Sequence, residues 1–233
     1  MLEVNNLSKR YNDNLVLDNI SFSIKKGDIV SVVGPSGSGK STLLRCIDLL
    51  EKSEGEILFE GKKLYKGEIG KKIGMVFQQF NLFPHLSVLD NIILAPTKLK
   101  LMAKKDATKK AYELLDTIDL KDKANSYPNE LSGGQKQRLS ITRGVIANPK
   151  ILILDDSTSA VDSETELRIR NNLNCLLKDT TVLIITQRIN TMQSADRVIV
   201  LEDGEVEAIG TPDELMATSR IYQEIYNSQQ ILN

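Results

Sequence analysis

The residues best suited to chemistry form the run GPSGSGKS, from Gly34 to Ser41. Its spacing, G-x-x-x-x-G-K-[ST], lets glycine N–H groups close on a polyphosphate, while the helix that follows directs its positive end at the same oxygens. Lys40 would reach the β and γ phosphates, and the Ser41 hydroxyl would ligate Mg²⁺. The predicted nucleotide-binding residues of this run are Gly34, Ser36, Gly37, Gly39, Lys40, Ser41 and Thr42. We therefore expect a site for a nucleoside triphosphate and its magnesium ion.

A second anion-binding run, LSGGQ, lies about a hundred residues further on and precedes an amphipathic helix. Ser132 is placed as an N-cap, and Gly133 and Gly134, followed by Gln135, would expose backbone donors. The run has no lysine of its own. Such a half-site is useful if it completes the ATP site of another chain from outside. A capped surface helix is the alternative interpretation.

Buried strands around these runs predict an α/β fold. The apolar run DIVSVVG leads into the phosphate loop, and KILILD and TVLIIT flank a helical stretch from about 163 to 178. Strand, helix, strand order predicts a mostly parallel sheet. Alternation at Ile20, Phe22 and Ile24 predicts an N-terminal antiparallel layer. Asp203-Gly204 predicts a tight hairpin, and the chain is expected to close with one helix from about 213 to 229.

Composition excludes several classes of protein. With 233 residues and 41% hydrophobic content the chain can bury a core, and we expect a single domain. A net charge of -1 disfavours binding to nucleic acid. No run approaches the roughly 20 apolar residues of a membrane span, and no signal peptide is recognisable, so we expect a cytoplasmic protein. Cys46 and Cys175 lie far apart among apolar neighbours, which predicts reduced, structural thiols.

Taken together, these runs resemble the ATP-binding cassette (ABC) ATPases of membrane transporters over nearly the whole chain. The resemblance implies a P-loop NTPase (RecA-like) core over 1–85 and 148–233, with a helical signature subdomain inserted over 86–147. It also implies that Tyr11 stacks on adenine, that Gln78 in VFQQF senses Mg²⁺ and water, and that Asp155 is linked to Mg²⁺. Asp162, in SAVD, matches the loop that communicates across a dimer.

The chain departs from the family pattern at two positions of the hydrolytic step. The residue after Asp155 is normally glutamate and is Asp156 here. The shorter side chain retracts the carboxylate by roughly 1 Å, and a misplacement on that scale can lower the reaction rate about 10²-fold. The switch position, normally histidine, is Gln187, which cannot carry a proton. Lys40, Gln78, Asp156 and Gln187 are the predicted catalytic residues, and Ser41, Gln78 and Asp155 the predicted metal ligands. We expect an ATPase with intact binding and strongly reduced turnover.

The two halves of the chain resemble different branches of the family. Residues 1 to about 131 are similar to ATP subunits of polar amino-acid uptake systems, whereas 151–233 look like the degenerate-site nucleotide domain of heterodimeric exporters. A natural or engineered hybrid is one interpretation, and an uptake ATPase that has drifted is the other.

The resemblance also implies partners. Phe83, Pro84 and His85 lie where a separate transmembrane permease would dock, which places the chain at the inner face of the cell membrane. The expected assembly is a head-to-tail homodimer, or a heterodimer with a related ATPase subunit, around two ATP molecules. The rival function is a non-hydrolysing, ATP-gated dimerisation module. A soluble cassette protein of translation or DNA repair, or a small-molecule kinase, explains fewer of the motifs.

Overall fold

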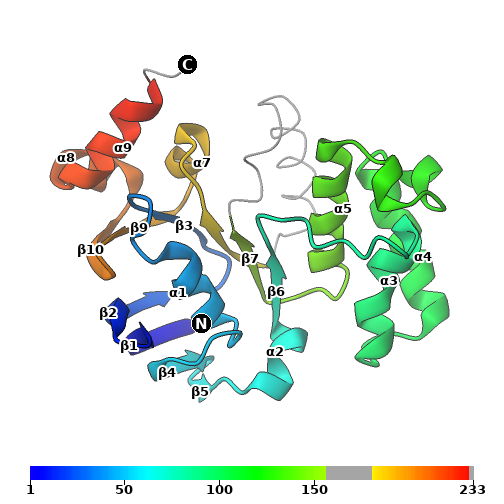
Figure 1. Ribbon diagram of the computed structural model, residues 1–233, viewed down its shortest axis with the longest axis horizontal. Coiled ribbons are helices and arrows are strands. Elements are labelled where there is room, and N and C mark those ends of the chain that lie inside the picture. The colour runs from blue at the N-terminus through cyan, green and yellow to red at the C-terminus, as the bar shows by residue number, and fades with distance from the viewer. Residues whose placement is uncertain (156–179, 231–233) are drawn as a thin grey trace. The chain divides into compact units, whose positions relative to one another are not determined.

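The computed structural model describes residues 1–155 and 180–230, which fall into two compact units of an α/β fold (Figure 1). Unit 1 comprises Met1–Ile69 and Thr180–Asn233, and unit 2 comprises Gly70–Asp179. The phosphate loop belongs to unit 1 and the LSGGQ run to unit 2. The expected helix from about 163 to 178, together with Asp156, Asp162 and Cys175, lies outside the described residues.

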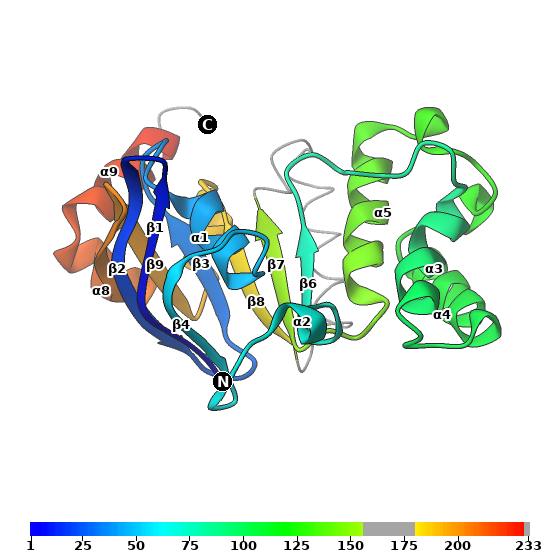
Figure 2. The same ribbon diagram turned by 60° about the horizontal axis from the view of Figure 1, so that its bottom comes forward.

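Unit 1 begins with an antiparallel sheet of strand order β2-β1-β4-β5, and Figure 2 shows β2, β1 and β4 side by side. The strands are β1 (Leu2–Tyr11), β2 (Asn14–Ile24), β4 (Glu54–Phe59) and β5 (Lys62–Lys63). Every second side chain at the end of β2 is buried, namely Ile20, Phe22 and Ile24. The predicted antiparallel layer is thus confirmed, because period-two burial arises when one face of a strand packs on a core.

The second sheet of unit 1 runs in the order β10-β9-β3-β8. β3 (Ile29–Val33) pairs in parallel with β8 (Thr181–Ile185) and with β9 (Arg197–Glu202), and β10 (Glu205–Gly210) is antiparallel to β9. The turn between β9 and β10 has positive φ at both Asp203 (45°) and Gly204 (84°), as a two-residue hairpin requires. The mostly parallel sheet and the hairpin are both as predicted.

The C-terminal end of unit 1 differs from the prediction of one helix over 213–229. Two helices, α8 (Pro212–Thr218) and α9 (Arg220–Gln230), are separated by Ser219, whose backbone is extended. The Ser219 hydroxyl donates to the Glu207 carboxylate (2.8 Å) and accepts from the Tyr222 N–H (3.1 Å), so it caps α9 and breaks the helix. Tyr222, with Val33 and Met192 of α7 (Ile189–Gln193), belongs to one apolar cluster that anchors both helices.

Unit 2 contains a parallel pair of strands, β6 (Ile73–Val76) and β7 (Ile151–Asp155), with α2 (Lys66–Lys72) leading into β6. The stretch 86–147, predicted to be helical, contains α3 (Val88–Lys98), α4 (Lys104–Thr117) and α5 (Gly133–Val145), drawn in green in Figure 1, with two short 3₁₀ turns, Lys121–Lys123 and Pro128–Glu130. Its status as a separate subdomain stays a prediction. Within residues 1–155 and 180–230, no helix is both long and apolar enough to cross a membrane.

Candidate nucleotide-binding site

The phosphate loop follows β3, and its backbone explains why glycine recurs in it. Gly34 is buried, and a Cβ at this position would collide with the Leu201 carbonyl oxygen. Gly37 and Gly39 have φ values of 85° and 95°, a left-handed region that side chains disfavour. A Cβ on Gly39 would also lie 2.6 Å from a methyl group of Leu17. The loop path between strand and helix therefore depends on glycine.

The Lys40 ammonium group lies against the loop itself. It donates to the carbonyl oxygens of Gly34 (2.9 Å) and Pro35 (2.6 Å) and to the Ser38 hydroxyl (3.3 Å). Ser38 is buried, whereas Ser36 and Gly37 are exposed at the tip. The Lys40 ammonium group is thus held against the backbone of the loop. When a nucleotide binds, its phosphate oxygens would take the place of the carbonyl oxygens as acceptors.

α1 (Lys40–Ile47) starts at this loop and is anchored by buried residues beyond its first turn. Leu43, Leu44, Cys46 and Ile47 are buried and fix the helix, while Ser41 and Thr42 are half-buried in its first turn. Gly39 is the N-cap and supplies no side chain to cap the helix. Glycine path, lysine charge, helix N-terminus and the Ser41 hydroxyl together fit a polyphosphate with a hard divalent cation.

Tyr11 is the last residue of β1 and is 39% exposed. The Lys9 ammonium group lies over its ring, 4.4 Å from the ring centroid, and also forms an ion pair with Glu51 at 2.9 Å. Tyr11 is therefore an accessible aromatic side chain held within the same unit as the phosphate loop.

Gln187 lies in a tight turn after β8. The buried Thr186 hydroxyl accepts from the Arg188 N–H two residues on, at 3.1 Å, which is a side-chain-closed turn. This turn leaves the Gln187 side chain exposed, at the carboxyl end of a parallel strand. α/β proteins place ligand-binding side chains at such strand ends.

In unit 2 the LSGGQ run opens α5 with a capping box. The Ser132 hydroxyl accepts from the Gln135 N–H at 3.3 Å, and the Gln135 side-chain oxygen accepts from the Ser132 N–H at 2.9 Å. The predicted N-cap role of Ser132 is confirmed. Gly133 is exposed, and a Cβ added to it would meet nothing within 4 Å, so close backbone packing does not explain this glycine.

The segment that carries Gln78 follows β6 and is fastened to α5. The Ser140 hydroxyl donates to the Phe80 carbonyl oxygen (3.1 Å), and the Arg143 guanidinium donates to that of Asn81 (2.6 Å). Gln78 itself is exposed. Asp155 is the buried last residue of β7. The same helix, α5, thus follows the LSGGQ run at its N-terminus and, through Ser140 and Arg143 further along, holds the segment next to Gln78.

The segment from Phe83 to Ser87 depends on a residue that sequence reasoning missed, the buried Asn91 of α3. Its amide group donates to the carbonyl oxygens of Phe83, Leu86 and Ser87, each at 3.0 Å, and its oxygen accepts from the Phe83 N–H at 2.9 Å. An asparagine inside the apolar helical run VLDNIILAP was the available signal, because a buried amide needs several partners.

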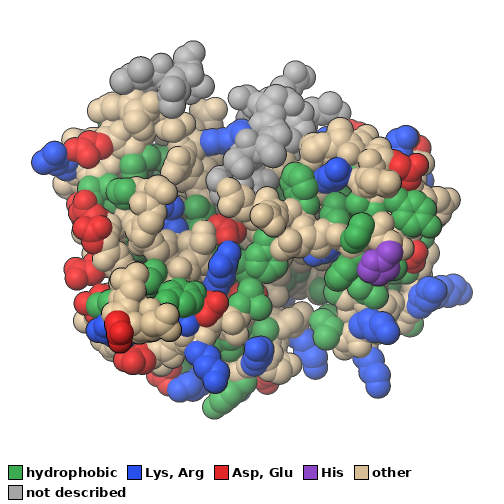
Figure 3. All heavy atoms as spheres, in the orientation of Figure 1, with side chains coloured by type: hydrophobic (Ala, Val, Ile, Leu, Met, Phe, Trp, Pro, Cys, Tyr) green, Lys and Arg blue, Asp and Glu red, His purple; other side chains and the backbone are tan. Residues whose placement is uncertain are grey.

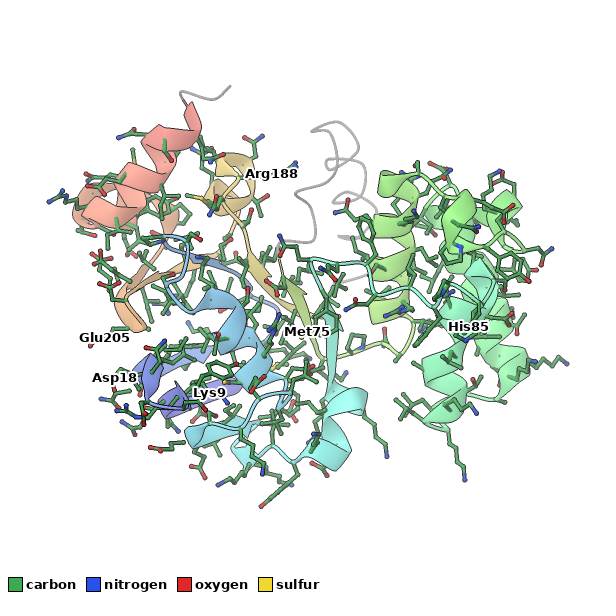
Figure 4. The ribbon with its side chains drawn as sticks, in the orientation of Figure 1. Lys9, Asp18, Met75, His85, Arg188 and Glu205 are labelled. Carbon is green, nitrogen blue, oxygen red and sulfur yellow. The ribbon has the colours of Figure 1, made fainter. Side chains whose placement is uncertain are left out.

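Phe83 remains 40% exposed beside His85, with their ring centroids 6.2 Å apart, and the Arg143 guanidinium lies 5.4 Å from the Phe83 ring centroid. Figures 3 and 4 show the His85 side chain at the surface, with hydrophobic side chains close to it. A fixed backbone thus presents an exposed aromatic side chain.

Cys46 is a free, buried thiol of α1, and burial raises its pKa to about 11. A thiol with this pKa is unreactive at neutral pH, which agrees with the structural role expected from the sequence.

A glycine-lined loop that joins a buried parallel strand to a helix, with a lysine at the first helical position, defines a P-loop nucleotide-binding protein. A family model described as ABC transporter matches residues 17–159, and the chain belongs to this family of transporter ATPases. The fold class predicted from the sequence is confirmed by this match and by the solved cassettes below.

The chain is similar to several curated proteins along its length. The glutamine transport ATP-binding protein GlnQ of Geobacillus stearothermophilus is 38% identical over 241 residues and covers 100% of both chains. The arginine transport ATP-binding protein ArtM of Bacillus subtilis is 41% identical, with 94% of this chain and 95% of ArtM covered. Among solved structures, a dimeric post-hydrolysis state of the ATP-binding cassette MJ0796 bound to ADP and Pi matches with a TM-score of 0.83 and 39% identity. It covers 91% of this chain and 98% of that one.

The interpretation of the chain as a hybrid finds no support in these comparisons. GlnQ and ArtM align across both halves, including the segment from 151 onward that looked exporter-like. The substitutions at 156 and 187 therefore occur in a chain that is similar along its length to ATP-binding proteins of amino-acid transport.

Proposed function

We propose that this chain is the ATP-binding subunit of an importer for polar amino acids, located at the inner face of the cell membrane. The proposal rests on one observation above all: the Lys40 ammonium group is held against a glycine-dependent loop at the N-terminus of α1. The named functions of the relatives, glutamine and arginine transport, support the substrate class.

In this function the residues of unit 1 hold the nucleotide. Lys40 and the loop N–H groups bind the β and γ phosphates, Tyr11 stacks on adenine, and the Ser41 hydroxyl ligates Mg²⁺. When bound, Mg²⁺ neutralises charge on the phosphates. Gln78 and Asp155 of unit 2 are the other proposed ligands. The half-site around Ser132 contributes its N–H groups to the ATP held by a second subunit, in line with the dimeric state of MJ0796.

The loop held by Asn91 is the proposed docking site for the permease. Four hydrogen bonds fix its backbone, while Phe83, Pro84 and His85 are exposed. A rigid loop loses little entropy on binding, so an exposed aromatic on such a loop suits recognition of a partner.

Uptake measurements in the native host test this function directly. Deleting the gene should reduce uptake of radiolabelled polar amino acids, glutamine and arginine first, and the unmodified gene should restore it. Lys40→Ala should fail to restore uptake, whereas Lys63→Ala, which removes an exposed lysine of β5, should restore it fully. Increased cellular retention of a substrate after deletion would indicate an exporter and would contradict the proposal.

We also propose that turnover is slow. Asp156 and Gln187 replace the glutamate that polarises water and the histidine that contacts the γ-phosphate. Neither change removes a group needed for binding ATP, because the Gln187 amide can still hydrogen-bond the γ-phosphate. Steady-state hydrolysis by the assembled transporter should stay well below about 1 s⁻¹, the lower end of ordinary enzyme rates. A rate at or above that value would refute slow turnover and leave the importer function intact.

The rival function, an ATP-gated dimerisation module, draws its support from the same two substitutions. It predicts that dimers formed with ATP and with a non-hydrolysable analogue dissociate at equal rates. Faster dissociation with ATP would favour the transport ATPase.

A further inference from the structure

Lys9 connects the proposed adenine-binding residue to the helix that begins at the phosphate loop. Its ammonium group lies 4.4 Å from the Tyr11 ring centroid, 2.9 Å from a Glu51 carboxylate oxygen and 2.9 Å from the Lys52 carbonyl oxygen. The Lys9 side chain is only 10% exposed although it carries a charge. Figure 4 shows Lys9 on β1, close to the ribbon of α1. A charged group this enclosed has a defined position.

Glu51 belongs to the segment that follows α1. The N–H groups of Leu50 and Glu51 donate to the Arg45 carbonyl oxygen in the last turn of that helix, at 2.9 and 3.2 Å. The Glu51 carboxylate therefore moves with α1, and Lys9 links it to the Tyr11 ring.

Electrostatics supports the same arrangement. The hydrogen bond from Lys9 lowers the pKa of Glu51. The reciprocal hydrogen bond raises the pKa of Lys9. Both groups are therefore charged across the physiological range, and the Lys9 ammonium restrains Tyr11 at one face of its ring.

An aromatic ring has two faces, and a base can stack only on a face that is open. With the ammonium over one face of Tyr11, the opposite face is the one available to adenine. Fixing the ring in advance removes the loss of side-chain entropy that stacking would otherwise require.

We propose that Lys9, clamped by Glu51 and the Lys52 carbonyl, is a positioning residue that orients Tyr11 for adenine and ties the base-binding end of the site to α1. The inference rests on the proposed function, in which Tyr11 stacks on adenine, and it adds a residue that contacts no phosphate. It concerns recognition of the base alone.

Two ligands separate base recognition from phosphate binding: MgATP, and inorganic triphosphate with Mg²⁺, which lacks the base. Removing an aromatic stacking partner costs about 1–3 kcal/mol, so Tyr11→Ala should weaken MgATP binding by roughly 5- to 150-fold. Lys9→Met keeps the stem of the side chain and should weaken MgATP binding about fivefold through loss of ring orientation. Neither variant should change the Kd for inorganic triphosphate.

The double variant and two controls complete the test. Lys9→Met should add nothing in the Tyr11→Ala background, because its effect acts through the ring. Lys9→Arg should restore most of the affinity, since guanidinium both pairs with carboxylates and stacks on rings. Lys63→Met removes the exposed 3.7 Å ion pair with Glu56 on the same sheet and should leave the Kd for MgATP and the Kd for inorganic triphosphate unchanged.

A spectroscopic readout is available because the chain has no tryptophan. Tyr11→Trp supplies a single reporter at the stacking position, and its fluorescence should be quenched by saturating MgATP. Adding Lys9→Met should reduce the amplitude of this quenching even when the nucleotide is saturating, which a loss of stability alone would not do.

Different outcomes contradict different statements. Equal weakening of MgATP and inorganic triphosphate by Lys9→Met would make Lys9 a structural support of the phosphate loop. Tighter MgATP binding would mean that the ammonium covers the face that adenine needs. An effect of Tyr11→Ala without any effect of Lys9→Met would overturn the positioning role and leave the adenine role of Tyr11 standing. No effect of Tyr11→Ala would refute that adenine role itself.

Discussion

The N-termini of α1 and α5 are both preceded by glycine-containing runs, yet they are built differently. At α1 the N-cap is Gly39, which has no side chain to offer, and Lys40 brings a positive charge into the loop. At α5 the N-cap is Ser132, and a capping box with Gln135 satisfies one backbone N–H of each partner. The first end is arranged to take an anion as its cap, whereas the second is already capped by its own chain.

The glycines of the two runs differ in the same sense. Gly34 and Gly39 are required by the fold, because a Cβ would collide with neighbouring atoms of unit 1. Gly133 is free of such contacts. A glycine that folding does not require is best explained by access of a ligand to the backbone, which agrees with a half-site completed by a second subunit.

The largest difference between the two ends should appear on removal of the lysine. Lys40→Ala deletes charge-assisted hydrogen bonds to phosphate worth about 1.5–3 kcal/mol each, so the Kd for MgATP should rise about 100-fold or more. Isothermal titration calorimetry measures this, with Lys63→Ala as the control. An unchanged Kd would show that α1 is not the phosphate-binding helix.

Alanine at the two glycines should separate folding from access. Gly34→Ala should lower the free energy of unfolding by more than about 2 kcal/mol, because the added methyl meets a backbone oxygen that cannot move aside. Gly133→Ala should leave it unchanged or raise it by up to about 1 kcal/mol, since alanine is the better helix former. Urea denaturation measures both. Similar losses at the two positions would remove the distinction between the runs.

The opposite end of α1 predicts a pH dependence. Burial raises the pKa of Asp48, the C-cap of α1, to about 7 from an ordinary value of 3.8. The folded state therefore holds this proton more tightly than the unfolded state, and the contribution of Asp48 to stability falls as pH rises from about 4 to about 7. The free energy of unfolding of Asp48→Asn, measured by urea denaturation, should equal that of the unmodified protein at pH 4. At pH 8 it should be higher by about 1–4 kcal/mol. If the difference in unfolding free energy between the two proteins does not change with pH, Asp48 does not ionise as a buried carboxyl group.

The smallest effect concerns the second end. Ser132→Ala should cost about 1 kcal/mol of stability through loss of the N-cap. Its Kd for MgATP as a monomer should be unchanged, while ATP-dependent dimerisation, followed by sedimentation velocity, should weaken. A change in the monomer's Kd would place Ser132 in its own subunit's site and would refute the half-site.

The sequence predicted the parts of this molecule that depend on local chemistry. Glycine spacing predicted the phosphate loop, alternating apolar and polar residues predicted β2, and a serine before GGQ predicted the α5 cap. Contacts between distant segments were beyond its reach: Lys9 reaches Glu51, 42 residues away. The break at Ser219 was missed because serine is tolerated inside helices. Its role as a cap appears only in the structure, where its hydroxyl accepts from the Tyr222 N–H and donates to Glu207 of β10.

The central claim is that ATP binding is intact while its hydrolysis is weakened by Asp156 and Gln187. The most direct measurement compares the unmodified protein with Asp156→Glu/Gln187→His for both the Kd of MgATP and the steady-state turnover. The account predicts Kd values within about threefold of each other and a turnover at least tenfold higher in the double variant, with a larger gain than either single change. Equal turnover in the two proteins would contradict it.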